Sequence, residues 1–499
     1  MNQRASAYAN PLLLLLLAII GSRLLTMAIL PFSGTTEPRY AVIARIMAET
    51  GDWITPWYDN GTPFWGKPPL SFWLQALSIR LFGIDEFSAR LPAWLVTLGI
   101  VLLIHALGKR LYGREAALWS TLVFSSMALT YVAAGAVMTD VFLTLGSTLA
   151  FVSIAMLSLG ARSFWRWLFF IGLAVGLLAK GPLVLVLTGG TLMIWLAWSA
   201  GAGRVLGALP WVRGTLVTAA VSLPWYLMAE WRTPGFLDYF ILGEHLLRFI
   251  DPGWQGDLYG SAHDQPYGTI WWYWLLASFP WGFAVIALAA RRTVAAHRGA
   301  VPLLPQWSDG EKLLVSSAIL PGLFFTLSGN ILWTYQLPAM PALALLLGLP
   351  LSEMPMRKAA CKLRKMSILV VPVVVTLGGS WASFHPLQLR TEKYLVQAYR
   401  SARGTSGAPL HYIRKAPFSA RYYGADAIRI LNSTEALAQL KETDRSVGYF
   451  AVRRPELELL QAQSAVRCEP IANSKRHVLL ECHYRPGDSS SGSERELLF

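Results

Sequence analysis

The sequence predicts a mainly α-helical, polytopic membrane protein with a small α/β domain at its C-terminal end. Hydrophobic residues make up 54% of the 499-residue chain and charged residues only 14%, whereas soluble domains carry about 25% charged residues. Long apolar runs recur as far as about residue 385, and shorter apolar strands alternate with polar helical patterns after that point. The 21 Trp and 18 Tyr residues fit a protein with two membrane–water interfaces, where amphipathic rings gather.

The apolar runs predict about eleven membrane spans. A spanning helix needs roughly 20 mainly apolar residues, and two of the candidates are short. Arg23 interrupts the first run and no small-residue cleavage site follows it, so this run is interpreted as a span and not as a signal peptide. The predicted spans are 11–31, 91–108, 115–135, 141–159, 164–179, 183–199, 211–231, 269–290, 313–329, 332–350 and 367–385.

The net charge of +14 is distributed in short basic clusters between the apolar runs. This distribution indicates membrane topology and argues against nucleic acid as a partner. Alternate loops carry most of the Lys and Arg residues, which is the bias expected of cytoplasmic loops. We therefore expect a cytoplasmic N-terminus and, with an odd number of spans, an extracytoplasmic C-terminal domain. The basic residues of these loops are Lys109, Arg110, Arg114, Arg162, Arg166, Arg204, Arg291, Arg292, Arg298, Lys312, Arg357, Lys358, Lys362, Arg364 and Lys365.

Three domains are predicted along the chain. Residues 1–385 form the membrane domain, whose long extracytoplasmic loops are 32–90 and 232–268. The first loop has helical apolar spacing at 38–49. Residues 386–487 form the soluble α/β domain, with the strands LHYI, AIRIL, VGYFAV and HVLLECHY and a helical pattern that starts near Ser433. Residues 488–499 are polar and are predicted to be disordered.

Two of the three cysteines, Cys468 and Cys482, lie in the predicted exported domain. Disulfides persist in oxidising compartments, so this pair is a candidate disulfide, with two separate thiols as the alternative. Cys361 lies in a predicted cytoplasmic loop.

Ionisable residues at one membrane boundary are the candidates for chemistry, because such groups are costly there. Those on the extracytoplasmic side are Glu37, Arg39, Lys67, Asp140 and Lys180. Asp140 and Lys180 each also have a structural interpretation. Asp140 precedes an apolar run and could cap its helix. Lys180 could extend its ammonium group to the membrane surface.

The stretch TEPRYAVIARIMAETGDWITPWYDNGTPFWGKPPLSFW at 36–73 resembles the first extracytoplasmic loop of the lipid A aminoarabinose transferases, the ArnT-like proteins. More broadly, it is similar to bacterial relatives of the dolichyl-phosphate-mannose–protein mannosyltransferases. Further matching motifs follow in order: TD at 139–140, AKGP at 179–182, EHLLRF at 244–249, QP at 265–266, FPW at 279–281 and TYQLPAMPALAL at 334–345. The resemblance covers about residues 11–350 and implies a GT-C fold glycosyltransferase that takes a sugar from a polyprenyl-phosphate carrier.

The resemblance also implies roles for individual residues. Glu37 and Asp140 correspond to the acids of the family and are the candidate catalytic bases, since a carboxylate can accept the proton of an attacking hydroxyl. The candidate ligands of the carrier phosphate are cations, which stabilise a leaving phosphate: Lys67, Lys180, Arg248 and Arg39. Further pocket candidates are Tyr40, Glu244, His245, His263 and Tyr335.

Three positions depart from the family pattern. Thr36 stands where relatives have an acid before Glu37, and Gly66 stands where the aminoarabinose transferases have Glu. The segment SGNILWTY at 328–335 lacks the lysine that many relatives have near Ile331. These departures lie at the predicted pocket and leave the donor sugar and the acceptor open. No cofactor is predicted, and a divalent metal at His245 or His263 stays an alternative to a structural role for these residues.

The leading functional hypothesis is an inverting transferase in a bacterial inner membrane. It would move a sugar from polyprenyl (undecaprenyl) phosphate to a hydroxyl or phosphate of lipid A, another glycolipid, a glycan or a protein. The alternative is a transporter or flippase of a lipid-linked saccharide, which would require charged groups or broken helices at mid-membrane. A scaffold that presents the soluble domain would leave Glu37, Lys67, Asp140 and Lys180 without a role.

Overall fold

The computed structural model describes residues 2–59, 61–251, 253–260, 263–302, 305–354, 358–432, 447–454, 457 and 466–484. Two compact units make up the chain. The first comprises residues 1–29 and 43–379 and is the helical unit; the second comprises 30–42 and 380–499. The prediction put the start of the soluble domain at residue 386 and assigned 30–42 to the membrane domain. The helical pattern from Ser433 and the predicted disordered tail at 488–499 lie outside the described residues.

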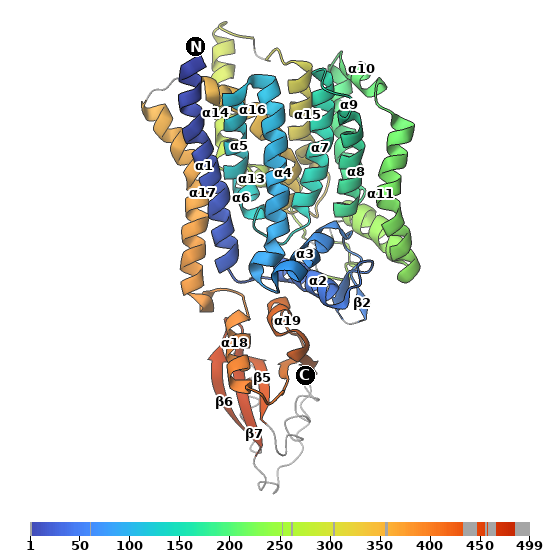
Figure 1. Cartoon of the computed structure of the whole chain (residues 1–499), viewed down its shortest axis with the longest axis vertical. Helices are drawn as coiled ribbons and strands as arrows, with labels where there is room; N and C mark the ends of the chain where they lie inside the picture. The colour runs from blue at the N-terminus through green and yellow to red at the C-terminus, as the bar shows by residue number, and fades with distance from the viewer. Residues whose placement is uncertain are drawn as a thin grey trace. The chain divides into compact units, whose positions relative to one another are not determined.

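The helical unit is a bundle of long helices with shorter pieces at both ends (Figure 1). Its principal helices are α1 (Asn2–Ile29), α3 (Leu70–Phe82), α4 (Glu86–Tyr112), α5 (Arg114–Ser126), α6 (Ala128–Ala133), α7 (Asp140–Ser158), α8 (Trp165–Lys180), α9 (Leu183–Trp198), α10 (Ala202–Gly207), α11 (Trp211–Arg232), η1 (Asp238–Leu247), α12 (Arg248–Ile250), α13 (Thr269–Ala277), α14 (Trp281–His297), α15 (Asp309–Thr326), η2 (Trp333–Ala339), α16 (Met340–Glu353) and α17 (Lys358–Phe384). The short strands β1 (Trp57–Asp59) and β2 (Thr62–Pro63) form a hairpin in the first long loop. Helix α2 (Thr36–Thr50) begins in the second unit and contains the predicted helix at 38–49.

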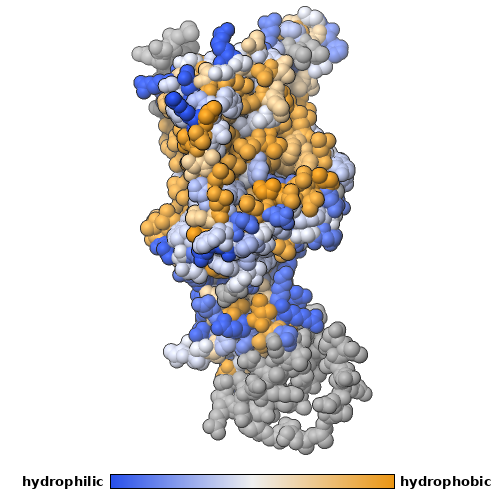
Figure 2. Space-filling view, turned by 90° about the vertical axis from the view of Figure 1, so that its right-hand side faces the viewer, coloured by the Kyte–Doolittle hydropathy of each residue, from blue (hydrophilic) through white to orange (hydrophobic). Residues whose placement is uncertain are grey.

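All eleven predicted spans lie on helices, so the prediction of a polytopic helical protein is confirmed. Among the described residues, five helices are long and apolar enough to cross a membrane, or six if α13 and α14, which meet at a bend of 106°, count as one span. The other candidates are short, interrupted or more polar; α5 and α6, for example, are separated at Met127. Hydrophobic residues cover much of the side surface of the helical unit (Figure 2), as expected of a surface that faces lipid.

Close packing between α7 and α8 brings their ends together. A side chain on Gly146 would lie 2.7 Å from the carbonyl oxygen of Gly172 and from the backbone nitrogen of Gly176. Small residues allow membrane helices to approach closely in this way. Because α7 and α8 are consecutive and antiparallel, the first residue of α7, Asp140, and the last residue of α8, Lys180, lie at the same end of the pair.

The second unit contains a five-stranded mixed sheet with the strand order β4-β3-β5-β7-β6. Strand β3 (Leu410–Ile413) pairs in parallel with β4 (Ile428–Leu431) and β5 (Gly448–Arg453), and β7 (His477–Tyr484) is antiparallel to β5 and β6 (Val466–Asn473). The helices α18 (Lys393–Arg403) and α19 (Phe418–Gly424) supply Leu395 and Ala420 to its core. The predicted α/β domain is therefore present, and β6 is a strand that the sequence pattern did not indicate.

Three contacts explain why residues 30–42 group with this sheet unit. The ring of Phe32 packs edge-on against Tyr422 with a centroid distance of 4.7 Å, and its backbone N–H donates to the hydroxyl of Tyr423. In addition, the backbone N–H of Gly34 donates to the carbonyl oxygen of Arg390. Apolar periodicity could not reveal this grouping because the contacting residues are more than 350 positions apart in the sequence.

Candidate active site

The α7–α8 pair carries the first element of the site. Lys180 Nζ lies 2.5 Å from Oδ1 of Asp140, and the two side chains are only 9% and 12% exposed. Asp140 is the first residue of α7, and Thr139 occupies the N-cap position before it. The ammonium group of Lys180 is largely buried in this ion pair. The capping interpretation of Asp140 is wrong, because Thr139 is the N-cap residue.

Tyr335 on η2 lies against the same pair. Its ring centroid is 4.7 Å from Lys180 Nζ and 4.7 Å from the ring of Phe325 on α15. A cation near an aromatic face gains electrostatic stabilisation. The segment before η2 is itself held in place, because the backbone N–H of Ile331 donates to His263 and that of Gln265 donates to Gly329.

Lys67 follows the β1–β2 hairpin and carries the second element of the site. The hydroxyl of Tyr259 fixes this loop by accepting from the backbone N–H of Trp65 and donating to the carbonyl of Pro63. Lys67 Nζ donates to Oε2 of Glu244 at 3.0 Å and to its neighbour's carbonyl oxygen on Gly66. The first long loop and the π-helix η1 are thus joined by an ion pair between residues 177 positions apart.

Glu244 is the centre of this second cluster. Its side chain is 4% exposed and also accepts from Arg248, one helical turn later, at 2.9 Å, and from the hydroxyl of Tyr239 at 3.3 Å. Burial alone would raise the pKa of Glu244, but Lys67 and Arg248 lower it to about 2. Arg248 further contacts Asp257 at 3.3 Å. Glu244 is therefore a permanent anion at neutral pH.

His245 connects the two clusters. Its Nδ1 lies 2.7 Å from the carbonyl oxygen of Phe240 and its Nε2 lies 3.1 Å from that of Lys180. Burial lowers the pKa of His245, so the imidazole is neutral at pH 7. The chain packs closely against His245 just after Lys180. A Cβ atom on Gly181 would lie 3.2 Å from the His245 ring.

The charges of the two clusters balance. Three cations, Lys67, Lys180 and Arg248, contact three carboxylates, Asp140, Glu244 and Asp257. Buried charges need such compensation because the desolvation of each ion is costly. Any further anion would have to compete with a carboxylate for these cations.

The remaining sequence candidates are Glu37, Arg39, Tyr40 and His263. Glu37, Arg39 and Tyr40 are on the first turns of α2, in the segment that groups with the second unit. The Arg39 guanidinium lies 5.2 Å from the Tyr40 ring centroid. The approach of Glu37 to Asp140 therefore stays a prediction. The backbone N–H of His263 donates to Asn330, and the described residues include no group of three or more His, Cys, Asp or Glu side chains that could hold a metal ion.

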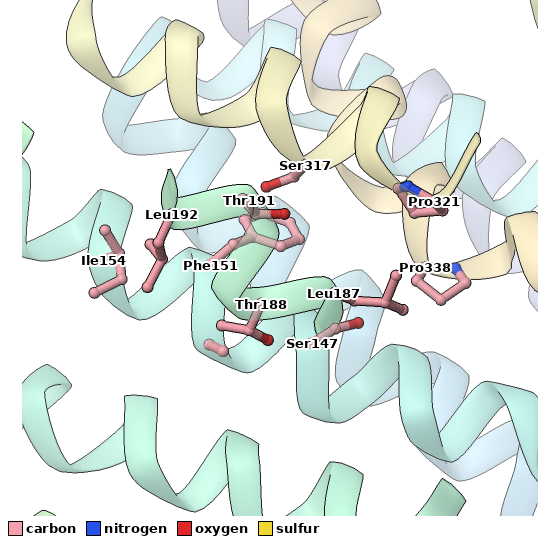
Figure 3. A pocket seen from close by; sticks show the side chains of 11 residues that line it. Ser147, Phe151, Ile154, Leu187, Thr188, Thr191, Leu192, Ser317, Pro321 and Pro338 are labelled. Carbon is pink, nitrogen blue, oxygen red and sulfur yellow. The ribbon is translucent and has the colours of Figure 1, made fainter. Parts of the chain in front are cut away.

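A cavity lies deeper in the bundle, between α7, α9, α15 and η2 (Figure 3). Ser147, seven residues after Asp140, and Thr188 contribute hydroxyl groups, and Pro338 on η2 lies three residues after Tyr335. None of the lining residues is ionisable. The candidate active site is therefore the charged cluster and not this cavity.

Sequence reasoning gave no role to Asp257 or Tyr239. The spacing of Glu244 and Arg248 by four residues predicts their contact on a helix. Asp257, in contrast, lies in a loop without periodicity, and only folding brings it to Arg248. The one indication that the sequence offers of a role for Asp257 is that it is an acid in an aromatic-rich loop, which is predicted to be extracytoplasmic.

Comparisons with known proteins bear on the fold and on the family resemblance. A model of the dolichyl-phosphate-mannose-protein mannosyltransferase family matches residues 14–240. The undecaprenyl phosphate-alpha-4-amino-4-deoxy-L-arabinose arabinosyl transferases of Shewanella sediminis and Erwinia tasmaniensis are 31% and 30% identical to the chain. Each match covers 62% of this chain and 54% of the relative, so the chain spans about half the length of these relatives.

One solved structure decides the fold. The crystal structure of ArnT from Cupriavidus metallidurans bound to undecaprenyl phosphate covers 97% of this chain and 99% of that one, with a TM-score of 0.73 and 18% identity. The chain has the ArnT-like GT-C fold. An Archaeoglobus fulgidus oligosaccharyltransferase is more distantly similar, with a TM-score of 0.50, 11% identity, and coverage of 85% and 65%. The resemblance of this ArnT-like chain to the aminoarabinose transferases, first indicated by its motifs, is confirmed.

Proposed function

We propose that this chain is a membrane glycosyltransferase that moves a sugar from undecaprenyl phosphate to an acceptor, with inversion at the anomeric carbon. The observation that carries the proposal is the direct connection of Lys67 and Arg248, through η1 and His245, to the Asp140–Lys180 pair. The candidate phosphate-binding cations and a candidate base thus belong to two neighbouring clusters that His245 connects. The names of the relatives, which are sugar transferases, favour transfer over transport.

The reaction assigns different tasks to the cations and the acids. The acceptor oxygen attacks the anomeric carbon, and the bond from that carbon to the carrier's phosphate oxygen breaks. The lipid phosphate leaves with the bonding electrons, and Lys67, Arg248 and Arg39 would stabilise its charge. The hydroxyl proton passes to a carboxylate, for which Asp140 and Glu37 are the candidates.

The charge balance of the site suggests an order of events. Lys180 pairs with Oδ1 of Asp140, so the ammonium group occupies a carboxylate oxygen that the proposed base would use. A carrier phosphate that attracts Lys180 would release Asp140 to accept the proton. Substrate binding and activation of the base would then be linked.

The proposed location is a bacterial inner membrane, with the site and the second unit on the extracytoplasmic side. Arg110 belongs to one of the basic clusters between the predicted spans. It donates a hydrogen bond to the carbonyl oxygen of Leu159, the residue directly after the C-terminal end of α7. Asp140 begins this helix of 19 residues, so about 28 Å separates the two ends. That distance matches the thickness of the hydrocarbon core and supports a cytoplasmic basic side opposite the site. A reporter that is active only outside the cytoplasm, fused after Phe499, should be active; an inactive fusion together with an active cytoplasmic reporter would contradict this orientation.

The proposed donor is undecaprenyl phosphate linked to 4-amino-4-deoxy-L-arabinose, as in the names of the relatives, and the proposed acceptor is lipid A. Gly66, beside Lys67, is a position where this sequence departs from the aminoarabinose-transferase pattern. Another pentose or hexose donor and another glycolipid, glycan or protein acceptor are therefore included in the test.

The decisive experiment uses the full-length protein in proteoliposomes with undecaprenyl-phosphate-linked sugars and lipid A, followed by mass spectrometry of the lipids. We expect a new glycosylated acceptor and free undecaprenyl phosphate in equal amounts. Comparison of lipid extracts from cells with and without the protein would identify the acceptor if lipid A is not modified. Movement of the intact lipid-linked sugar across the bilayer without any new glycosidic bond would overturn the proposal in favour of a transporter.

A further inference from the structure

Arg23 is a buried cation inside the apolar helix α1. It is the one charged residue between Pro11 and Ile29 and is 6% exposed. A charge within a membrane span is costly and usually marks a function. The mechanism proposed above does not use Arg23.

The contacts of Arg23 lead toward Asp140. Its guanidinium group donates to the carbonyl oxygen of Val132 at 2.9 Å, to that of Gly135 at 2.8 Å, and to the hydroxyl of Thr26 at 2.9 Å. Val132 lies in the last turn of α6, and its carbonyl oxygen also accepts from the backbone N–H of Gly135. Gly135 begins the connection from α6 to Asp140. Arg23 therefore caps α6 from a different helix.

Two further features show that this contact is built into the fold. A Cβ atom on Gly135 would lie 2.3 Å from Nε of Arg23, so the guanidinium group of Arg23 would have to move to make room for it. The neighbouring Ser22 hydroxyl lies 2.8 Å from the Tyr131 hydroxyl, and the Arg23 guanidinium lies 5.5 Å from the Tyr131 ring centroid. Two consecutive residues of α1 thus hold the end of α6.

We infer that Arg23 is a positioning residue that fixes residues 134–139 and so holds Asp140 beside Lys180. The inference rests on the proposed function, in which Asp140 accepts a proton. Only four residues separate Gly135 from Asp140, so movement of this anchor shifts the start of α7. A misplacement of about 1 Å at a reacting group can cost about 10²-fold in rate.

The test compares Arg23→Gln and Arg23→Lys with the parent in proteoliposomes. Arg23 adjoins a cavity with Trp94 and Thr97, so the shorter side chains fit without crowding. We expect Arg23→Gln to lower kcat by about 10-fold to 100-fold, to shift the pH–rate profile, and to leave the affinity for undecaprenyl phosphate unchanged. Arg23→Lys should restore part of kcat because it retains a donor. An unchanged kcat and pH profile in Arg23→Gln would overturn the inference.

A variant at Gly135 and a hydrogen-exchange measurement distinguish a failure of the positioning role from a failure of the proposed function. Gly135→Ala should reproduce the loss of kcat with Arg23 intact, whereas Gly21→Ala, at an open position on α1, should not. Hydrogen exchange of residues 134–142 should rise in Arg23→Gln and Gly135→Ala whether or not the protein transfers sugar. Faster exchange in a protein without transferase activity would contradict the proposed function alone. Unchanged exchange would contradict the positioning role.

Discussion

Lys180 Nζ and Asp140 Oδ1 lie 2.5 Å apart at the matched ends of two antiparallel helices. Forty residues separate them in the sequence, and glycine contacts between α7 and α8 bring them together. The geometry of the site thus depends on helix packing some distance from the charges, and this dependence can be tested separately from the chemistry.

The first prediction concerns that packing. In Gly172→Ala, the new methyl group would lie 2.7 Å from the carbonyl oxygen of Gly146 and 2.9 Å from the backbone nitrogen of Ala150. The helices must separate, so we expect a loss of about 1–3 kcal/mol in the free energy of unfolding together with reduced activity. The measurements are denaturation in detergent and the transfer rate. Gly189→Ala on α9, where nothing lies within 4 Å, is the control and should leave both unchanged.

The second prediction separates the charge of Asp140 from its chemistry. Asp140→Asn leaves the Lys180 ammonium buried without its carboxylate, and the loss of one partner of a buried pair costs roughly 3–5 kcal/mol. The same variant should lower the transfer rate by about 10²–10⁴-fold if Asp140 is the base. The double variant Asp140→Asn with Lys180→Met should recover stability but not activity. If the double variant regains full activity, Asp140 is not the base.

The third prediction concerns Glu244 and phosphate. In Glu244→Gln, Lys67 and Arg248 lose the carboxylate that they share, so a phosphate no longer competes with it. We expect undecaprenyl phosphate to raise the unfolding temperature of Glu244→Gln more than that of the parent. Glu49→Gln removes a carboxylate from a more exposed ion pair with Arg45 and is the matched control. A smaller shift in Glu244→Gln than in the parent would show that these cations do not bind the carrier phosphate.

The fourth prediction follows from the lowered pKa of Glu244. Because its pKa is about 2 in the folded protein against 4.5 ordinarily, folding favours the ionised form. The resulting stability is fully present above about pH 4.5 and is lost as the pH falls toward 2. Unfolding curves from pH 6 to pH 3 should therefore fall more steeply for the parent than for Glu244→Gln. Parallel curves would show that Glu244 is not held as an anion.

The fifth prediction concerns the disulfide. Cys468 and Cys482 lie opposite each other on β6 and β7 and are joined in the structure. A bridge that closes a loop of this size stabilises a domain by about 3 kcal/mol in the chain-entropy model. Cys468→Ser with Cys482→Ser should therefore make the second unit more sensitive to proteolysis. Thiol labelling of the parent under denaturing, non-reducing conditions should detect one cysteine, Cys361; labelling of three would show that the bridge is absent from the protein.

Local patterns determined much of this protein in advance. The apolar runs predict where the long helices of the bundle lie, because length and hydrophobicity are properties of contiguous residues. The motif residues Lys67, Asp140, Lys180, Glu244 and Arg248 were all identified as candidates, and their types already indicate acid–base and phosphate chemistry. The strands LHYI, AIRIL, VGYFAV and HVLLECHY are likewise evident from composition and alternation.

Only the tertiary structure decided which of these residues meet. The sequence predicts cations gathered around a phosphate, whereas the structure pairs Lys67 with Glu244, Arg248 with Asp257, and Lys180 with Asp140. It also assigns residues 30–42 to the sheet unit and joins Arg23 to Gly135. An ion pair between distant residues depends on how closely helices pack, and that is set by contacts such as Gly146 with Gly172. No local period in the sequence encodes such contacts, because each one requires two surfaces to fit.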